Sequence, residues 1–131
     1  MSVVTIDTDV ASAMLRGRLP PQLEARLAGR DLAVTFVTVG ELTKWVELRS
    51  WGLRRLTALS QFYERVVVLP YSVAVAHHWG QMQAGAVRRG RPRPANDTWI
   101  AACCLVSDLP LATLNHKGFF DYSDHETLRL F

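Results

Sequence analysis

Four short apolar runs alternate along this chain with longer segments in which apolar residues recur at helical spacing. The runs lie at Val3–Ile6, Asp31–Phe36, Val66–Leu69 and Leu111–Leu114. Their β-branched side chains favour strands, and strands that alternate with helices form a mostly parallel sheet covered on both faces. We therefore expect an α/β/α sandwich with a mostly parallel central sheet of four to five strands, in which Leu128–Phe131 is the possible fifth strand at an edge.

Helices are expected between these strands. The expected segments are Val10–Arg16, Gln22–Ala28, Thr38 to near Gly52, Leu53–Tyr63, Ser72–Arg89, and a segment that begins within a residue or two of Asn96 and ends near Leu105 or Val106. Pro94 cannot lie inside a helix, so it sets the start of the last one. No repeat or linker divides the chain, and we expect a single domain over residues 1–131.

The composition is that of an ordinary globular protein, with 49% hydrophobic and 21% charged residues. The formal net charge of +3 permits a polyanionic partner but does not require one. Cys103 and Cys104 are adjacent within an apolar run, which predicts buried thiols in a reducing compartment. That run is too short to cross a bilayer, and no secretory signal is evident, so we expect a cytoplasmic protein without membrane contact.

Three acidic side chains lie where a predicted strand gives way to a helix. Asp7 ends the first strand, Glu41 opens the helix after the second strand, and Asp97 lies in the first turn of a later helix. Ligands of doubly wound sheets bind at the carboxyl ends of the strands, so these acids could converge on one pocket. Structural explanations stay open, because Asp97 suits a helix cap and Thr38–Glu41 has the spacing of a capping box, in which Glu41 would accept from the Thr38 amide.

A cluster of carboxylates is costly unless a cation compensates it, and Mg²⁺ or Mn²⁺ prefers oxygen ligands. Such a cation suits phosphoryl chemistry, because it activates water and stabilises charge on the leaving oxygen. Arginine binds phosphate through two parallel hydrogen bonds. The cations that could face a phosphodiester substrate are Arg88, Arg89, Arg91, Arg93 and Lys117. A solvated helix end is the alternative explanation for this basic run.

Four motifs, in order and spacing, resemble those of PIN domains, and more narrowly those of the VapC toxins of bacterial toxin–antitoxin pairs. They are Ile6-Asp7-Thr8-Asp9, Thr38-Val39-Gly40-Glu41-Leu42, Asn96-Asp97-Thr98-Trp99-Ile100-Ala101 and Leu111-Ala112-Thr113-Leu114-Asn115. The resemblance covers essentially the whole chain. It implies a PIN-like fold and a magnesium-dependent endoribonuclease that cuts RNA, often tRNA, and halts translation.

The resemblance also implies roles for individual residues and partners. Asp7, Glu41 and Asp97 would be the catalytic acids, with Asp7 and Asp97 as direct metal ligands, while Thr8 and Thr113 would help to shape the site. The expected partners are a VapB-type antitoxin that occludes the pocket, an RNA substrate and a second copy of the chain in a homodimer.

One position departs from the family pattern. Many relatives carry an acid three residues beyond the asparagine that follows the last strand, and here that place is Gly118. Asp121 and Asp124 lie downstream, but nothing in the sequence turns either of them inward. Asn115 would then be the polar side chain that this loop contributes to the catalytic site, and we expect a higher metal requirement than in a relative with four acids.

Other functions compete with the nuclease. Gly118 also suits a non-catalytic nucleic-acid-binding or regulatory domain on a degenerate PIN scaffold. A phosphoacceptor receiver domain ranks last, because Pro70 and Tyr71 stand where its aspartate would follow the third strand. The large apolar residues of Trp45–Leu56 predict core packing or, alternatively, a groove for the antitoxin or the second subunit.

Overall fold

The computed structural model describes residues 2–131 and is built on a four-stranded sheet. Its strands are β1 (Val3–Ile6), β2 (Asp31–Thr35), β3 (Val66–Leu69) and β4 (Leu111–Ala112), in the order β3-β2-β1-β4. Every pairing between neighbouring strands is parallel. The parallel α/β sheet that the sequence predicts is therefore confirmed.

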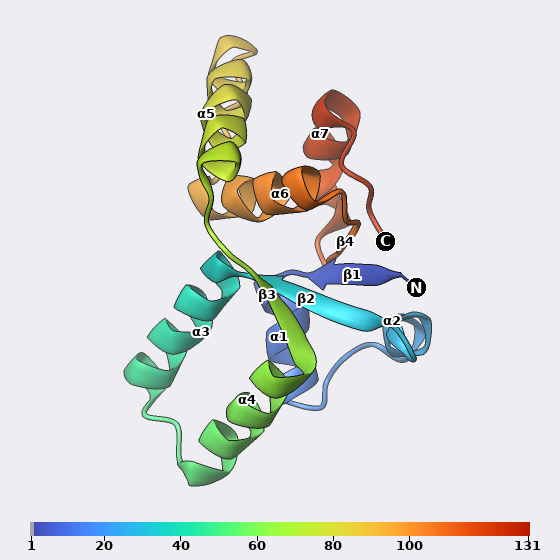
Figure 1. Cartoon of the computed structure of the whole chain (residues 1–131), viewed down its shortest axis with the longest axis vertical. Coiled ribbons are helices and arrows are strands. Elements are labelled where there is room, and N and C mark those ends of the chain that lie inside the picture. The colour runs from blue at the N-terminus through green and yellow to red at the C-terminus, as the bar shows by residue number, and fades with distance from the viewer. Residues whose placement is uncertain (1) are drawn as a thin grey trace.

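Helices cover both faces of this sheet. They are α1 (Thr8–Leu15), α2 (Pro21–Leu27), α3 (Phe36–Arg49), α4 (Leu53–Arg65), α5 (Val73–Arg88), α6 (Ala95–Ser107) and α7 (His116–Glu126). Figure 1 shows α5, α6 and α7 on one side of the sheet, α1, α3 and α4 on the other, and α2 beside the start of β2. Two apolar cores result, one around Met82, Ile100 and Tyr122 and the other around Val10, Leu42 and Phe62.

The strand order changes direction between β1 and β4. Strands β2 and β3 add successively on one side of β1, whereas β4 pairs with its other side. Such a switch opens a crevice beyond the carboxyl ends of the two strands, where ligands bind in doubly wound folds. Asp7 directly follows β1 and Thr113 directly follows β4, so both lie at this crevice.

The C-terminal part of the chain differs from the expectation. Residues Leu128–Phe131 do not form a fifth strand, because only an isolated parallel bridge joins Leu130 to Leu111. A helix that the sequence analysis missed, α7, precedes this segment. The Asn115 side chain caps it by accepting from the Gly118 amide, and its Phe119 and Tyr122 side chains are buried one turn apart.

The start of α3 also differs, and the capping box that was one of two open explanations for Glu41 does not form. Strand β2 ends at Thr35, and Phe36 is already helical. The Thr35 hydroxyl accepts from the Thr38 amide at 3.4 Å and so takes the capping role that was assigned to Glu41. Glu41 therefore lies in the second turn of α3, where its carboxylate is available for other contacts.

The two cysteines are buried in α6, as predicted. Burial raises the pKa of the Cys103 thiol to about 11 and that of the Cys104 thiol to about 12, because a thiolate would be desolvated there. Among residues 2–131, no helix combines the length and the apolar character that a membrane crossing needs.

Candidate active site at the ends of β1 and β4

Asp7 is a buried carboxylate at the N-terminus of α1. Its Oδ1 atom accepts from the Val10 amide at 2.9 Å, and only 5% of the residue is exposed. Burial is the largest influence on its pKa, which is raised above the usual 3.8. The Thr113 hydroxyl and the Val10 amide oppose this shift, whereas the charges of Asp9 and Asp97 add to it. Asp7 is thus fixed in place but only partly compensated.

A chain of hydroxyl groups connects α1 to α3 and positions Glu41. The Thr8 hydroxyl donates to Glu41 Oε1 at 2.6 Å and lies 2.9 Å from the Thr38 hydroxyl. Because Thr8 has a single hydroxyl proton and gives it to the carboxylate, Thr38 must donate to Thr8. Both threonines are buried, so the chain is shielded from water. Sequence reasoning gave Thr38 only a capping role, and its buried hydroxyl is one of the features it missed.

Asp97 lies in the first turn of α6, as predicted. The N-cap residue of this helix, Pro94, offers no side-chain hydrogen bond, and no described residue forms one with the Asp97 carboxylate. Burial raises the pKa of Asp97 above 3.8, and the charges of Glu41 and Asp9 raise it further. The neighbouring Asn96 donates from Nδ2 to Glu41 Oε2 at 3.5 Å. The first turn of α6 therefore meets the second turn of α3.

Asp9 is a fourth acid at this site, and the sequence analysis quoted it in a motif without giving it a role. It lies exposed in the first turn of α1, and its charge raises the pKa of both Asp7 and Asp97. The available signal was its spacing, because residues two apart at a helix N-terminus both lie near the end of the preceding strand. The structure therefore brings Asp7, Asp9, Glu41 and Asp97 into one electrostatic neighbourhood.

These acids do not form a ready-made cage. Within the described residues, no three His, Cys, Asp or Glu side chains are arranged so closely that they could hold a metal ion as they stand. Like charges repel one another, so four carboxylates separate when no cation offsets them. The donor set nevertheless fits a hard cation, because its members are oxygen ligands and the partly buried Asp97 carboxylate lacks a hydrogen-bonding partner among residues 2–131.

Thr113 and Asn115 occupy the loop after β4 but play different parts. The Thr113 hydroxyl accepts from the Asn115 amide at 2.9 Å and lies close enough to Asp7 to lower its pKa. The Asn115 carboxamide oxygen is committed to capping α7, 3.0 Å from the Gly118 amide nitrogen. A Cβ atom at Gly118 would overlap the Asn115 carboxamide. The glycine at this position is therefore matched to the cap that Asn115 makes.

Within residues 2–131, none of the predicted basic residues forms an ion pair with Asp7, Glu41 or Asp97. Arg88 and Arg89 end α5, and Figure 1 shows this end of α5 standing away from the sheet. Arg91 and Lys117 are exposed, and neither forms an ion pair with a described residue.

Arg93 is the clearest departure from the expected substrate-facing role. Only 4% of its side chain is exposed, and it pairs with Asp121 at 2.7 Å and with Glu126 at 2.6 Å. Its guanidinium also lies over the Tyr122 ring, 4.2 Å from the ring centre. Arg93 therefore ties the loop before α6 to α7, and Asp121 turns towards Arg93 to form this pair.

Comparisons with known proteins agree with this geometry. Residues 4–124 match the PIN domain family. The chain is 29% identical over 116 residues to the tRNA(fMet)-specific endonuclease VapC of Shigella flexneri, which covers 87% of each chain. It is 26% identical over 125 residues to the ribonuclease VapC1 of Haemophilus influenzae strain R2866, which covers 93% of each chain.

Solved structures give the same result. The structure of VapBC-1 from nontypeable Haemophilus influenzae superimposes with a TM-score of 0.83 at 27% identity, over 98% of this chain and 96% of the other. The family match, these relatives and the parallel sheet with acids at the β1–β4 switch all lead to one assignment. The chain belongs to the PIN-domain family and, within it, to the VapC toxins.

Proposed function

We propose that this VapC toxin is an endoribonuclease that uses Mg²⁺, or Mn²⁺ in its place, to cleave RNA, with tRNA as the substrate class, and thereby inhibits translation. The observation that carries this proposal is the group of acids at the β1–β4 switch, two of which have a raised pKa and no ion pair with a basic side chain in the described part of the chain. The relative from Shigella flexneri, named as a tRNA-specific endonuclease, supports the substrate class. Because tRNA is cytoplasmic, we expect the protein to act there.

In this proposal Asp7 and Asp97 hold the cation directly, because they come from opposite sides of the switch and are the most desolvated acids. Glu41 orients the attacking water from α3, and the Thr38–Thr8 hydroxyl chain fixes the position of its carboxylate. A divalent cation supplies, when bound, an activated water and positive charge beside the phosphodiester. The Thr113 hydroxyl favours the charged form of Asp7 and so opposes part of the effect of burial on its pKa. Asn115 contributes by fixing the start of α7 rather than by contacting the reacting atoms.

The purified chain tests this function with unstructured RNA and with bulk tRNA, each in EDTA and in Mg²⁺. We expect endonucleolytic fragments only with the cation, and a loss of at least about 100-fold in the Asp97→Asn protein, because a direct ligand matters more than an outer-shell partner. Equal cleavage by both proteins would point to a contaminating nuclease. RNA binding without any cleavage would favour a non-catalytic domain on this scaffold. Gly118 is consistent with that outcome, because it stands where many relatives carry an acid.

We also propose two protein partners. Structures of VapBC complexes among the neighbours support a VapB-type antitoxin. The α3–α4 hairpin exposes Leu48 by 73%, Leu53 by 81% and Leu56 by 40%, and such a patch is typical of an interface. The predicted core packing of Trp45–Leu56 thus applies to its partly buried tryptophans, and we assign the exposed leucines to the antitoxin.

The second proposed partner is another copy of this chain. Edge strand β3 and the residues after it expose Val67, Val68, Tyr71 and Val73. Light scattering of the purified chain is expected to give twice the monomer mass, and Val68→Lys is expected to reduce it to the monomer. Monomeric wild-type protein at micromolar concentration would contradict this assignment.

A further inference from the structure

A cavity of about 450 Å³ lies between the end of α1 and the α3–α4 turn, away from the catalytic acids. Four arginines line it, Arg16, Arg18, Arg49 and Arg55, together with Ser12 and Trp51. No acidic side chain is among its lining residues. Such a concentration of guanidinium groups around one hollow is unfavourable unless an anion occupies it.

The charges of this cavity are uncompensated. None of the four arginines forms an ion pair with any residue of the described chain. Instead Arg55 lies over the Trp51 ring, 5.8 Å from its centre, and Arg49 lies over the Trp45 ring at 5.2 Å. Contact with a ring face limits the positions of a guanidinium group but leaves its N–H groups, which lie in the guanidinium plane, free to bind a phosphate.

A donor without a partner belongs to one of the lining residues, Trp51. Trp51 Nε1 is buried, and no hydrogen-bond partner for it is found in residues 2–131. A buried N–H without a partner costs about 1–3 kcal/mol, so native proteins seldom leave one unsatisfied. The N-terminus of α4 also lacks a side-chain cap at Gly52 and begins beside Trp51. Beside its four arginines, the cavity is thus lined by the Trp51 indole and adjoins an uncapped helix terminus.

Two helices connect this cavity to the catalytic acids. On α1, Asp9 and Arg16 lie on one face, about two helical turns or ~10 Å apart, with Ser12 between them. On α3, Glu41, Trp45 and Arg49 follow one another at spacings of four residues, which also places them on one face, over ~12 Å. An extended RNA strand held at the acids can reach the arginine cavity within a few nucleotides.

We infer that the cavity of Arg16, Arg18, Arg49 and Arg55 binds a backbone phosphate of the RNA substrate, a few nucleotides from the bond that is cut. This inference rests on the proposed ribonuclease function and extends its substrate site beyond the acids. RNA is favoured because both helix faces run from the acids into the cavity. The site binds phosphate and does not discriminate between bases, because contacts to phosphate oxygens carry no sequence information.

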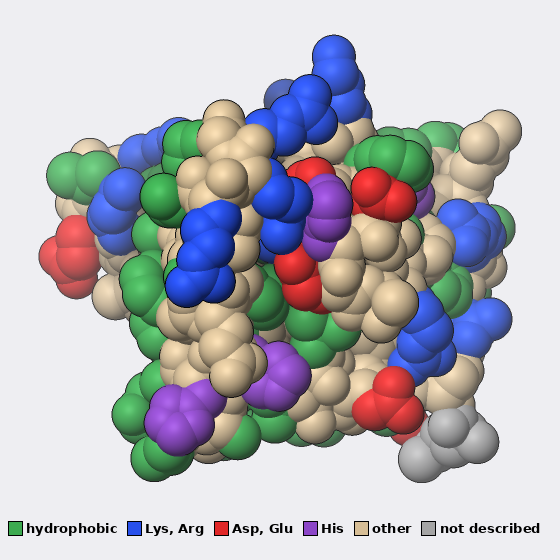
Figure 2. All heavy atoms as spheres, turned by 90° about the horizontal axis from the view of Figure 1, so that it is seen from above, with side chains coloured by type: hydrophobic (Ala, Val, Ile, Leu, Met, Phe, Trp, Pro, Cys, Tyr) green, Lys and Arg blue, Asp and Glu red, His purple; other side chains and the backbone are tan. Residues whose placement is uncertain are grey.

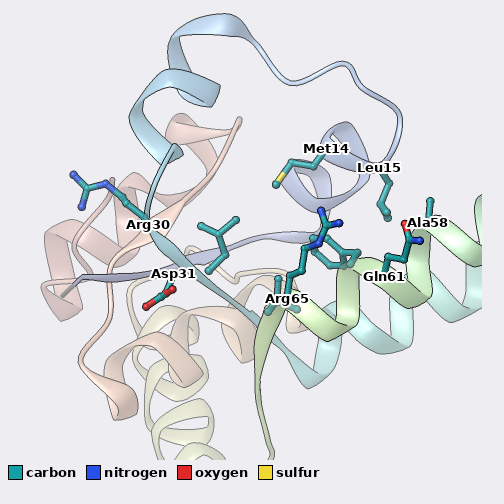
Figure 3. A pocket seen from close by; sticks show the side chains of 10 residues that line it. Met14, Leu15, Arg30, Asp31, Ala58, Gln61 and Arg65 are labelled. Carbon is teal, nitrogen blue, oxygen red and sulfur yellow. The ribbon is translucent and has the colours of Figure 1, made fainter.

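The adjoining surface extends this positive region. A second cavity shares Leu15 and Ala58 with the first and carries Arg30 and Arg65. Figure 3 shows Arg65 of α4 in the space between α4 and α1, with Met14 and Leu15 on the opposite wall. Asp31 is the acid among the lining residues of this second cavity. A strand that leaves the arginine cavity would therefore meet two further arginines on a mostly apolar surface.

The test measures binding separately from cleavage, with the Asp97→Asn protein as background and a fluorescent single-stranded RNA of about twelve nucleotides in EDTA. Arg49→Gln with Arg55→Gln is the test pair, and Arg54→Gln is the matched control, because Arg54 is exposed on α4 but does not line the cavity. We expect the test pair to weaken binding at least about tenfold. The slope of log K against log salt should fall by about 0.7 for each phosphate that the test pair no longer binds, while the control changes neither quantity.

A ligand without phosphate and an indole signal sharpen the result. A ribonucleoside carries no phosphate, so the wild type and the test pair should bind it equally. The Trp51 indole N–H resonance should shift on addition of the twelve-nucleotide RNA and should not shift with the ribonucleoside. Equal binding of the long RNA by the test pair and the control would overturn the inference. So would a test pair that loses affinity only for an acidic antitoxin peptide.

Failure of the inference and failure of the nuclease function are distinguishable. If the wild type cleaves RNA but the test pair binds it normally, only the arginine cavity is misassigned. If the test pair loses binding while the wild type never cleaves, the cavity is an RNA site on a non-catalytic domain. Melting temperatures within a few degrees of the wild type are expected for all variants, because the four arginines are exposed.

Discussion

Two clusters in this molecule contain carboxylates in opposite states. At the α5–α7 end, Arg93 is nearly inaccessible to water and satisfied by Asp121 and Glu126, which lowers the pKa of Asp121. Figure 2, which views the molecule from this end, shows acidic, basic and histidine side chains intermixed at the centre of the face. At the β1–β4 switch, by contrast, Asp7 and Asp97 have raised pKa values and form no ion pair with a basic side chain of residues 2–131.

This difference separates charged residues that stabilise the fold from charged residues that are arranged to bind a ligand. A compensated cluster is consistent with a structural role, because its members already stabilise one another. An uncompensated cluster destabilises the folded chain, and a site of this kind persists when a bound ligand offsets the cost. The arginine cavity next to α1 belongs to the second kind, with the opposite sign.

The largest stability effect is expected at the compensated cluster. Arg93→Met leaves Asp121 and Glu126 without their partner and removes the contact with Tyr122, so the free energy of unfolding should fall by about 3 kcal/mol. Urea unfolding measures this change. Arg129→Met is the matched control, because its ion pair with Asp108 is largely exposed and should be worth less than about 1 kcal/mol. Equal effects of the two variants would remove the contrast between the clusters.

A smaller effect on stability, together with an effect on activity, is expected from the hydroxyl chain. Thr8→Val keeps the side-chain shape but frees Glu41 Oε1, so cleavage should fall about 10–100-fold. The buried Thr38 hydroxyl also loses its acceptor, so the free energy of unfolding should fall by about 1 kcal/mol. Thr43→Val serves as the control, because the Thr43 hydroxyl only bonds the Val39 carbonyl of its own helix. A Thr8→Val protein with full activity would show that Glu41 needs no positioning.

Restoring an acid at Gly118 should cost stability. Gly118→Asp places a Cβ atom against the Asn115 carboxamide and displaces it from the start of α7, so the free energy of unfolding should fall by about 1 kcal/mol. Titration of cleavage against Mg²⁺ concentration measures whether the new carboxylate also lowers the metal requirement. An unchanged requirement would show that residue 118 lies outside the metal site.

The smallest effect concerns pH and the metal-free protein. Because burial raises the pKa of Asp7 and Asp97, the folded state binds more protons than the unfolded chain just above pH 3.8, and stability falls as the pH rises through that window. Asp97→Asn removes one such group, so its melting temperature in EDTA at about pH 7.5 should exceed that of the wild type by about 2–4 °C. Mg²⁺ should reduce this gap, and a less stable variant in EDTA would contradict the raised pKa.

The sequence carried most of the fold because its strands are short, apolar and β-branched, and Pro94 set the start of α6. Sequence reasoning missed α7 because Asn115 and Gly118 suggested a loop. The burial of its two aromatic side chains, Phe119 and Tyr122, depends on how the helix packs in the folded chain. Sequence reasoning misplaced the start of α3 because two threonines, Thr35 and Thr38, compete for the cap.

The site was predictable where it depends on position along the chain and not where it depends on tertiary contacts. Asp7 and Asp97 follow from their places at element ends. The burial of Arg93 could not be read from the sequence, because the residues that enclose it come from α7, far along the chain. The cavity of unpaired arginines likewise arises only when α1 meets the α3–α4 turn.

The two thiols in α6 have a practical consequence. A thiolate is the reactive form of cysteine, and with pKa values of about 11 and about 12 almost none of either side chain is ionised at neutral pH. Alkylating reagents should therefore leave the native chain unmodified. A single cysteine introduced on the surface could therefore be labelled with a fluorophore while the native pair is kept.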